Sequence, residues 1–76
     1  MKLRQLAKDG KSNTGRCPAV YVADDDPAVM VVQGKRLDPH TSAELDDILA
    51  DETAVRIPAE TMVRAIEKYL AERPRA

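Results

Sequence analysis

Residues 17–34 read CPAVYVADDDPAVMVVQG, and this stretch decides the expected fold. Two runs of apolar, mostly β-branched residues flank the acidic turn 24–27, a pattern typical of a β-hairpin. Pro18 suits the first position of a strand, where its missing N–H group is harmless. The pattern therefore predicts a hairpin over residues 18–33, and Gly34 ends its second strand.

Both faces of this predicted hairpin are apolar. Side chains alternate along a strand, so the residues fall into two sets that lie on opposite faces. A sheet with one face in water would carry polar residues at alternate positions. Either helices cover both faces, or one face is an interface with a partner, and the sequence leaves the choice open. The candidate partner-binding residues on the two faces are Val20, Val22, Met30 and Val32 on one, and Tyr21, Val29 and Val31 on the other.

The rest of the chain predicts two helices, one strand and a short helical turn. Asp38 as N-cap and Pro39 at the first helical position open a helix over about 39–49. Residues 54–57 read as a third strand, and residues 59–71 have the apolar spacing of an amphipathic helix. Apolar residues at i, i+3 and i+4 within residues 1–8 indicate one helical turn.

These elements predict an α+β fold with a small, mainly antiparallel three-stranded sheet. The sheet consists of hairpin 18–33 plus strand 54–57, and helices 39–49 and 59–71 pack on it. Residues 1–16 form a basic, flexible N-terminal arm, with five basic residues and one acidic residue. Residues 17–72 form a single domain, and residues 73–76 form a frayed C-terminus.

Length and composition favour association. A chain of 76 residues buries only about 60% of the surface that its unfolded state exposes, so its core is marginal. Small domains gain stability from disulfides, metals or partner subunits. The single Cys17 excludes an internal disulfide, and one Cys with one His argues against a structural zinc site. The remaining source of added stability is association, as a homodimer or as a complex with another protein.

The residues offer no catalytic, cofactor or metal site. Cys17 and His40 have no identifiable third group beside them, so the sequence predicts no enzyme. The aspartates at 24–26 lack the glycine and distal glutamate of a calcium-binding EF-hand loop. Lys11–Ser12 lacks the glycine spacing of a phosphate loop. No run reaches the ~20 apolar residues that span a bilayer, and no signal peptide is present, so we expect a cytoplasmic protein.

The layout resembles a group of small uncharacterised actinobacterial proteins. That group has a CPxVY segment, an acidic turn, VVQG, a following Asp, and a late ETxVxIP strand before a helix. Such proteins are often encoded beside helix-turn-helix regulators, so the resemblance implies an accessory partner of a transcription regulator. It covers roughly residues 15–62. The matching residues are Cys17, Pro18, Val20, Tyr21, Val31, Val32, Gln33, Gly34, Asp38, Glu52, Thr53, Val55, Ile57 and Pro58.

A shorter stretch is similar to a different class. Residues 54–59 read AVRIPA, like the strand-to-helix junction of AbrB-type and MazE-type antitoxin DNA-binding domains. In those folds the junction comes early, and later strands complete a swapped dimer, whereas here a hairpin precedes it. The implied alternative is a DNA-binding antitoxin or regulator. Its expected phosphate contacts are Lys35, Arg36, Arg56 and Arg64.

We therefore expect a non-catalytic protein-interaction module whose partner is a second copy or a regulator. The near-neutral charge, −1 in total, argues against a whole-domain nucleic-acid footprint. DNA binding remains as the alternative.

Overall fold

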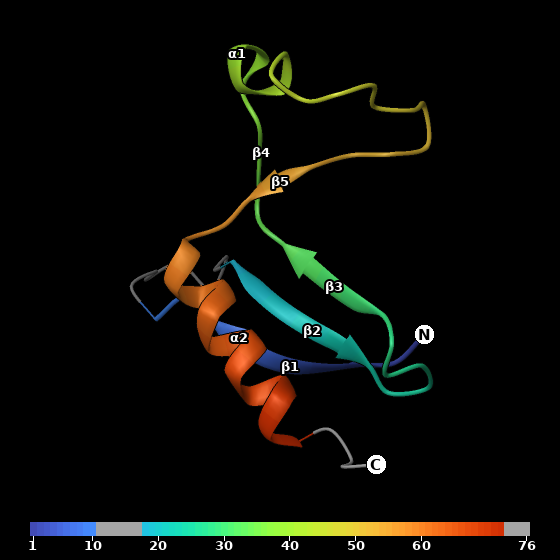
Figure 1. Ribbon diagram of the computed structural model, residues 1–76, viewed down its shortest axis with the longest axis vertical. Helices are drawn as coiled ribbons and strands as arrows, with labels where there is room; N and C mark the ends of the chain where they lie inside the picture. The colour runs from blue at the N-terminus through green and yellow to red at the C-terminus, as the bar shows by residue number, and fades with distance from the viewer. Residues whose placement is uncertain (11–17, 73–76) are drawn as a thin grey trace.

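The computed structural model describes residues 1–10 and 18–72, and within them it shows an α+β fold with two antiparallel sheets and two helices (Figure 1). The larger sheet has the strand order β1-β2-β3, and the smaller sheet pairs β4 with β5. The elements are β1 (Leu3–Lys8), β2 (Ala19–Ala23), β3 (Met30–Gln33), β4 (Lys35–Arg36), α1 (Pro39–Ser42), β5 (Val55–Arg56) and α2 (Ala59–Glu72).

The predicted hairpin is confirmed. Strands β2 and β3 pair antiparallel, with Val20 opposite Val32 and Tyr21 opposite Val31. The acidic turn closes through backbone hydrogen bonds, including one of 3.0 Å from the Ala23 N–H to the Val29 carbonyl. An Asp26 carboxylate oxygen also accepts from a backbone N–H within the turn, as short acidic side chains do in such turns.

The helical turn predicted for residues 1–8 is wrong, because Leu3–Lys8 is an edge strand paired with β2. The register shifts between Gln5 and Ala7, so Leu6 is the extra residue of a β-bulge. The bulge lets Leu6 and Ala7 both face the core, whereas Leu3 lies on the opposite face. Leu3, Leu6 and Ala7 therefore have the i, i+3, i+4 spacing that is typical of a helix, although they lie in a strand. The expected N-terminal arm therefore contributes a strand, and its remainder, residues 11–17, lies outside the described residues.

The third strand of the main sheet is also different from the prediction, since β1 takes that place. The segment expected there, residues 54–57, forms β5, and it pairs with β4 in a separate two-stranded sheet. Gly34 ends β3 as expected, but the chain resumes extended structure at once. Only the pairing partner, which lies about 20 residues further along, could reveal this.

The helix predicted over 39–49 is four residues long in the structure, Pro39–Ser42. Its start is as expected: Asp38 is the N-cap, and its carboxylate accepts from the Thr41 N–H at 3.2 Å. Most helical stability in proteins comes from burying an amphipathic face. Residues 38–53 are all exposed and bury no such face, so the helix is not extended.

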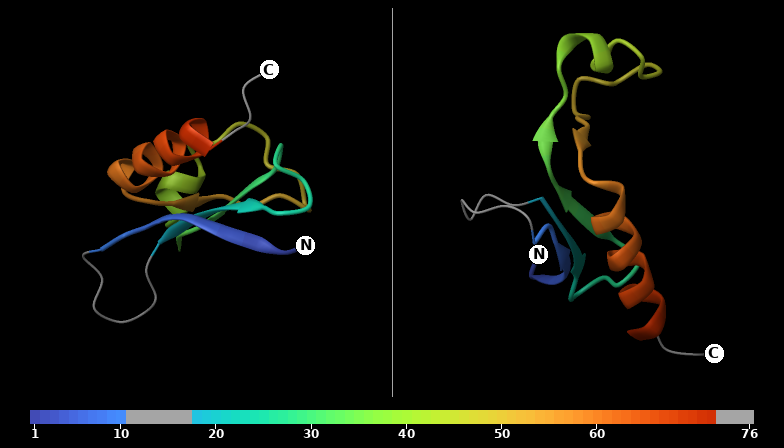
Figure 2. Two further views of the ribbon diagram at one scale, coloured as in Figure 1. Left: turned by 90° about the horizontal axis from the view of Figure 1, so that it is seen from below. Right: turned by 90° about the vertical axis from the view of Figure 1, so that its left-hand side faces the viewer.

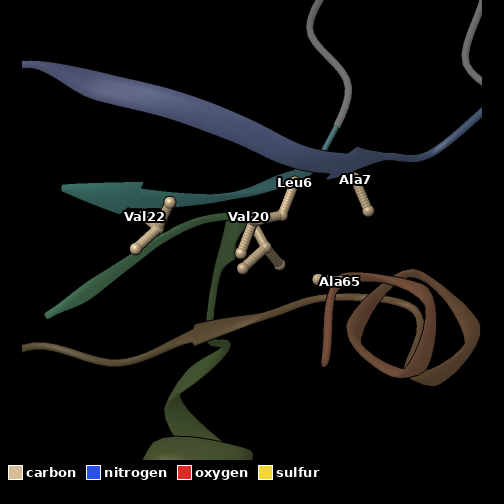
Figure 3. Packing of buried hydrophobic residues seen from close by; sticks show 5 residues of the cluster. All are labelled: Leu6, Ala7, Val20, Val22 and Ala65. Atoms are coloured by element: carbon tan, nitrogen blue, oxygen red, sulfur yellow. The ribbon is translucent and has the colours of Figure 1, made fainter. Parts of the chain in front are cut away.

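Helix α2 confirms the prediction for 59–71 and covers one face of the main sheet (Figure 2). The labelled side chains of β1 and β2 point to the side of the sheet on which Ala65 of α2 lies, and the small Ala65 side chain allows close approach (Figure 3). The buried cluster consists of Leu6, Ala7, Val20, Val22 and Ala65, with Met30, Val32, Ile57, Met62 and Tyr69 packed against it.

Three polar contacts hold α2 in place on the sheet. The Arg64 guanidinium donates to the Lys8 carbonyl at 2.8 Å, at the end of β1. The Tyr69 hydroxyl donates to the Pro27 carbonyl at 2.8 Å, at the hairpin turn. Arg4 forms an ion pair with Glu72 near the end of the helix. The helix is therefore fixed along its length to β1 and to the turn between β2 and β3.

Candidate protein-interaction surfaces

The two faces of the hairpin have different environments. Val20 and Val22 lie in the core, with Val20 fully buried. Met30 and Val32 pack against the same cluster and are partly buried. These four candidate residues therefore hold α2 on the sheet rather than forming an outer surface.

The opposite face carries the other candidates. Tyr21 and Val31 lie opposite each other there, and Val29 follows on the same side by alternation. All three are partly exposed, and Leu3 on β1 adjoins them. Among the described residues no helix covers this face (Figure 2). The Tyr21 hydroxyl donates to Gln33 at 3.0 Å, which keeps the ring along the sheet surface.

A projecting arm, which we define as residues 35–57, is the largest feature absent from the sequence predictions. It stands away from the body formed by α2 and the main sheet (Figures 1 and 2). The radius of gyration is 13.9 Å, against about 11 Å expected for a compact chain of this length. The arm has two parts: a stem, strands β4 and β5 with Ile57, and a tip, residues 37–54.

The tip exposes large apolar side chains among acidic ones. Leu45, Ile48 and Leu49 are exposed, Leu49 by 62%. A turn after Leu49 closes through two hydrogen bonds with Glu52, which accepts from the Leu49 N–H at 2.9 Å and donates its own N–H to the Leu49 carbonyl. The tip carries six carboxylates and no lysine or arginine: Asp38, Glu44, Asp46, Asp47, Asp51 and Glu52.

The pKa of Asp38 reports the local electrostatics of the tip. Hydrogen bonds from the Thr41 side chain and backbone lower the pKa of this carboxyl below 3.8, and the positive charge of Arg56 lowers it further. A lowered folded-state pKa means that the ionised cap stabilises the fold at neutral pH. That contribution is lost as the pH falls through the folded-state pKa.

The stem is basic, and the structure brings together three of the four residues predicted to contact phosphate. Lys35 lies directly opposite Arg56 across the two strands, so these two side chains share one face. Arg36 lies opposite Val55 and points to the other face. All three side chains are exposed. Like charges placed opposite each other across a strand pair are destabilising, so this cluster favours a nearby anion. Arg64 is elsewhere, bound to the end of β1.

A hollow of about 540 Å³ lies between the stem and the tip. Leu37, Ile48 and Val55 supply apolar lining, and Arg36 and Glu52 supply charge at its wall. Its volume falls within the 300–1,000 Å³ range of sites that accept a small ligand or a few side chains.

Helix α2 has a second apolar stripe, which faces away from the sheet. Val63, Ile66 and Leu70 are exposed at i, i+3 and i+7 and lie on one side of the helix. The sequence predicted one broad apolar face for this helix. The structure buries only part of it, because the small sheet covers only the side that carries Thr61 and Ala65.

The described residues hold no group of three His, Cys, Asp or Glu side chains that could bind a metal ion. His40 is exposed in α1, and the aspartates of the hairpin turn are exposed. Cys17 lies outside the described residues. Within the described part, no helix has the length and apolar character needed to cross a membrane.

Comparison with known proteins returned no matching family model, no matching curated protein and no matching solved structure. The two resemblances noted in the sequence therefore stay predictions, and the geometry of the chain itself carries the functional argument.

Proposed function

We propose that this chain is a non-catalytic protein-interaction module that binds another protein chain through its arm. The observation that carries the proposal is the tip, where Leu45, Ile48 and Leu49 are 39%, 44% and 62% exposed among acidic side chains. Contiguous exposed apolar side chains with a polar rim mark interaction surfaces on small domains. The resemblance to the actinobacterial group adds a transcription regulator as the proposed partner.

The energetics support a binding role for these side chains. Fully burying a leucine or isoleucine contributes about 1.5–3 kcal/mol, so covering the tip contributes several kcal/mol. The surrounding carboxylates form a hydrated rim that limits nonspecific association. Side chains with this exposure contribute little to the fold of the isolated chain, so their substitution separates binding from stability.

The test is affinity capture from the native cell with the wild-type chain and with a Leu45→Ser, Leu49→Ser double variant. We expect the wild type to retain a specific protein and the tip variant to retain at least about tenfold less of it. Leu3→Ser is the matched control, because it makes the same leucine-to-serine substitution at an exposed position outside the arm. Equal capture by all three chains, with folding verified by circular dichroism, would contradict an arm-mediated interaction.

A second candidate function is direct DNA binding through the stem, supported by the clustering of Lys35, Arg36 and Arg56. Lys35 and Arg56 share one face of the stem and can contact adjacent phosphates there, while Arg36 adds a positive charge on the other face. The six carboxylates of the adjoining tip oppose this function, because they repel the same phosphate backbone.

Electrophoretic mobility shift with random duplex DNA at low salt tests this second function, because nonspecific phosphate binding is strongest there. If the stem binds DNA, Arg36→Gln with Arg56→Gln abolishes the shift, while Lys2→Gln leaves most of it. No shift with the wild type at low salt rules out this function.

A further inference from the structure

We propose that two copies of this chain form a symmetric dimer in which their arms pair antiparallel, each acidic tip lying on the other copy's basic stem. The inference rests on the proposed function, since it names a second copy of the chain as the protein that the arm binds.

The charges of the arm are separated along its length. Residues 37–54 carry six acidic side chains and no lysine or arginine, whereas the stem carries three cations and no carboxylate. Among the described residues, the ion pairs involve Arg4 and Lys68, and none joins a tip carboxylate to a stem cation. Arg56 acts on Asp38 through its charge, but no ion pair among the described residues neutralises the other five tip carboxylates.

The separated charges of the arm suit two-fold symmetry. In a two-fold dimer the same surface serves both copies, so that surface must be complementary to itself. A surface with separated charges satisfies this condition when the two copies run antiparallel, because tip then meets stem twice. Parallel pairing would oppose six carboxylates to six and three cations to three. The charge pattern thus selects both the partner and its orientation.

The arm has little internal packing among the described residues. Strands β4 and β5 are two residues each and α1 is four residues, and residues 38–53 bury no side chain. Two-stranded ribbons and short helices are marginal without packing. Contact with a second arm would supply the missing burial, with apolar tip side chains such as Leu49 lying against the hollow beside Leu37 and Val55.

The arm is also long enough to form a dimer interface. It spans 23 residues, from 35 to 57. Stable interfaces of standard size use roughly 20–30 residues on each side and bury about 800 Å² per partner. The body need not take part, which leaves the apolar stripe of α2 and the Tyr21 face of the sheet outside the dimer.

A charge-exchange experiment tests the pairing. The stem variant carries Arg36→Glu and Arg56→Glu, and the tip variant carries Glu44→Lys and Asp46→Lys. The control variant, Glu60→Lys with Glu67→Lys, changes two exposed carboxylates of α2 instead. Sedimentation equilibrium gives the dimer dissociation constant of each chain and of an equimolar mixture of the stem and tip variants.

We expect the wild type and the control to dimerise, and each arm variant alone to dimerise at least about tenfold more weakly. The mixture should recover a heterodimer, because the acidic stem of one variant then meets the two new lysines on the tip of the other. At the second contact, an unchanged tip meets an unchanged stem. A wild type that is monomeric at high concentration overturns the inference. So does a dimer whose dissociation constant is unchanged in both variants, or a mixture without recovery.

Two further measurements cover variants that fail to fold. One measurement uses the neutral double variant Arg36→Gln with Arg56→Gln. The other is the salt dependence of the wild-type dimer, which reports on the same contacts. The wild-type dissociation constant should rise severalfold between low and high salt, and the neutral variant should show a smaller rise. A salt-independent dimer contradicts pairing through charge.

The outcome separates this inference from the function on which it rests. A monomeric wild type whose arm still captures a different protein refutes the dimer and leaves the interaction module standing. A wild type that neither dimerises nor captures a protein through the arm refutes both.

Discussion

Replacing Leu6 with alanine is expected to remove about 3 kcal/mol of stability and to bring the protein close to unfolding at room temperature. Leu6 is 5% exposed and lies at the β-bulge, against Val20 and Ala65 in the buried cluster. Leucine-to-alanine changes in cores cost about 2–5 kcal/mol, through lost transfer free energy and the cavity left behind. A domain of 76 residues has a total stability of only about 4–11 kcal/mol.

The same strand provides the control. Leu3 has the same side chain but lies on the opposite face and is 43% exposed. Leu3→Ala should change the free energy of unfolding by about 0.5 kcal/mol or less, as exposed substitutions usually do.

Urea unfolding followed by circular dichroism measures both variants at a protein concentration low enough to favour single chains. Equal losses at the two leucines, or a larger loss at Leu3, would show that β1 does not present Leu6 to the core.

The second large effect is expected at Gly34, between β3 and β4. A Cβ atom at this position would lie 2.3 Å from the Arg56 carbonyl oxygen and 3.1 Å from the Arg56 carbonyl carbon. Both are backbone atoms, so no side-chain rotation relieves the clash. Gly34→Ala should therefore separate β5 from β4 at a cost of about 1–3 kcal/mol, comparable with overpacking in a core.

The loss should be local to the arm. Amide hydrogen exchange should show loss of protection at Arg36 and Arg56, while Val20 and Ala65 stay protected in the body. The arm-mediated dimer should weaken in the same variant, because the stem no longer presents Lys35 beside Arg56.

Gly10 is the matched control, since a Cβ atom there meets nothing within 4 Å. Gly10→Ala should leave the exchange pattern unchanged and should be neutral to slightly stabilising, because alanine restricts the unfolded chain. Unchanged protection in the arm of the Gly34 variant would contradict the close approach of β5.

The sequence by itself determined the elements whose signals are local. The hairpin follows from two β-branched runs around an acidic turn, and α2 follows from apolar residues at helical spacing after Pro58. The separation of basic residues 35–36 from the acidic segment 38–52 is also readable directly. These features depend on neighbours a few residues apart, so they could be predicted with no knowledge of the fold.

Tertiary structure decided what depends on distant partners. The bulge at Leu6 arises only because β1 pairs with β2, and β5 pairs with β4 across about 20 residues. The helix predicted to reach residue 49 stops at Ser42 because no segment of residues 1–10 or 18–72 covers its apolar side. The position of α2 likewise decides which face of the hairpin is buried. Val20 packs in the same buried cluster as Ala65 of α2, whereas Tyr21 lies on the opposite, partly exposed face. Local pattern specifies an element, whereas burial specifies its length, its partner and the surfaces left for binding.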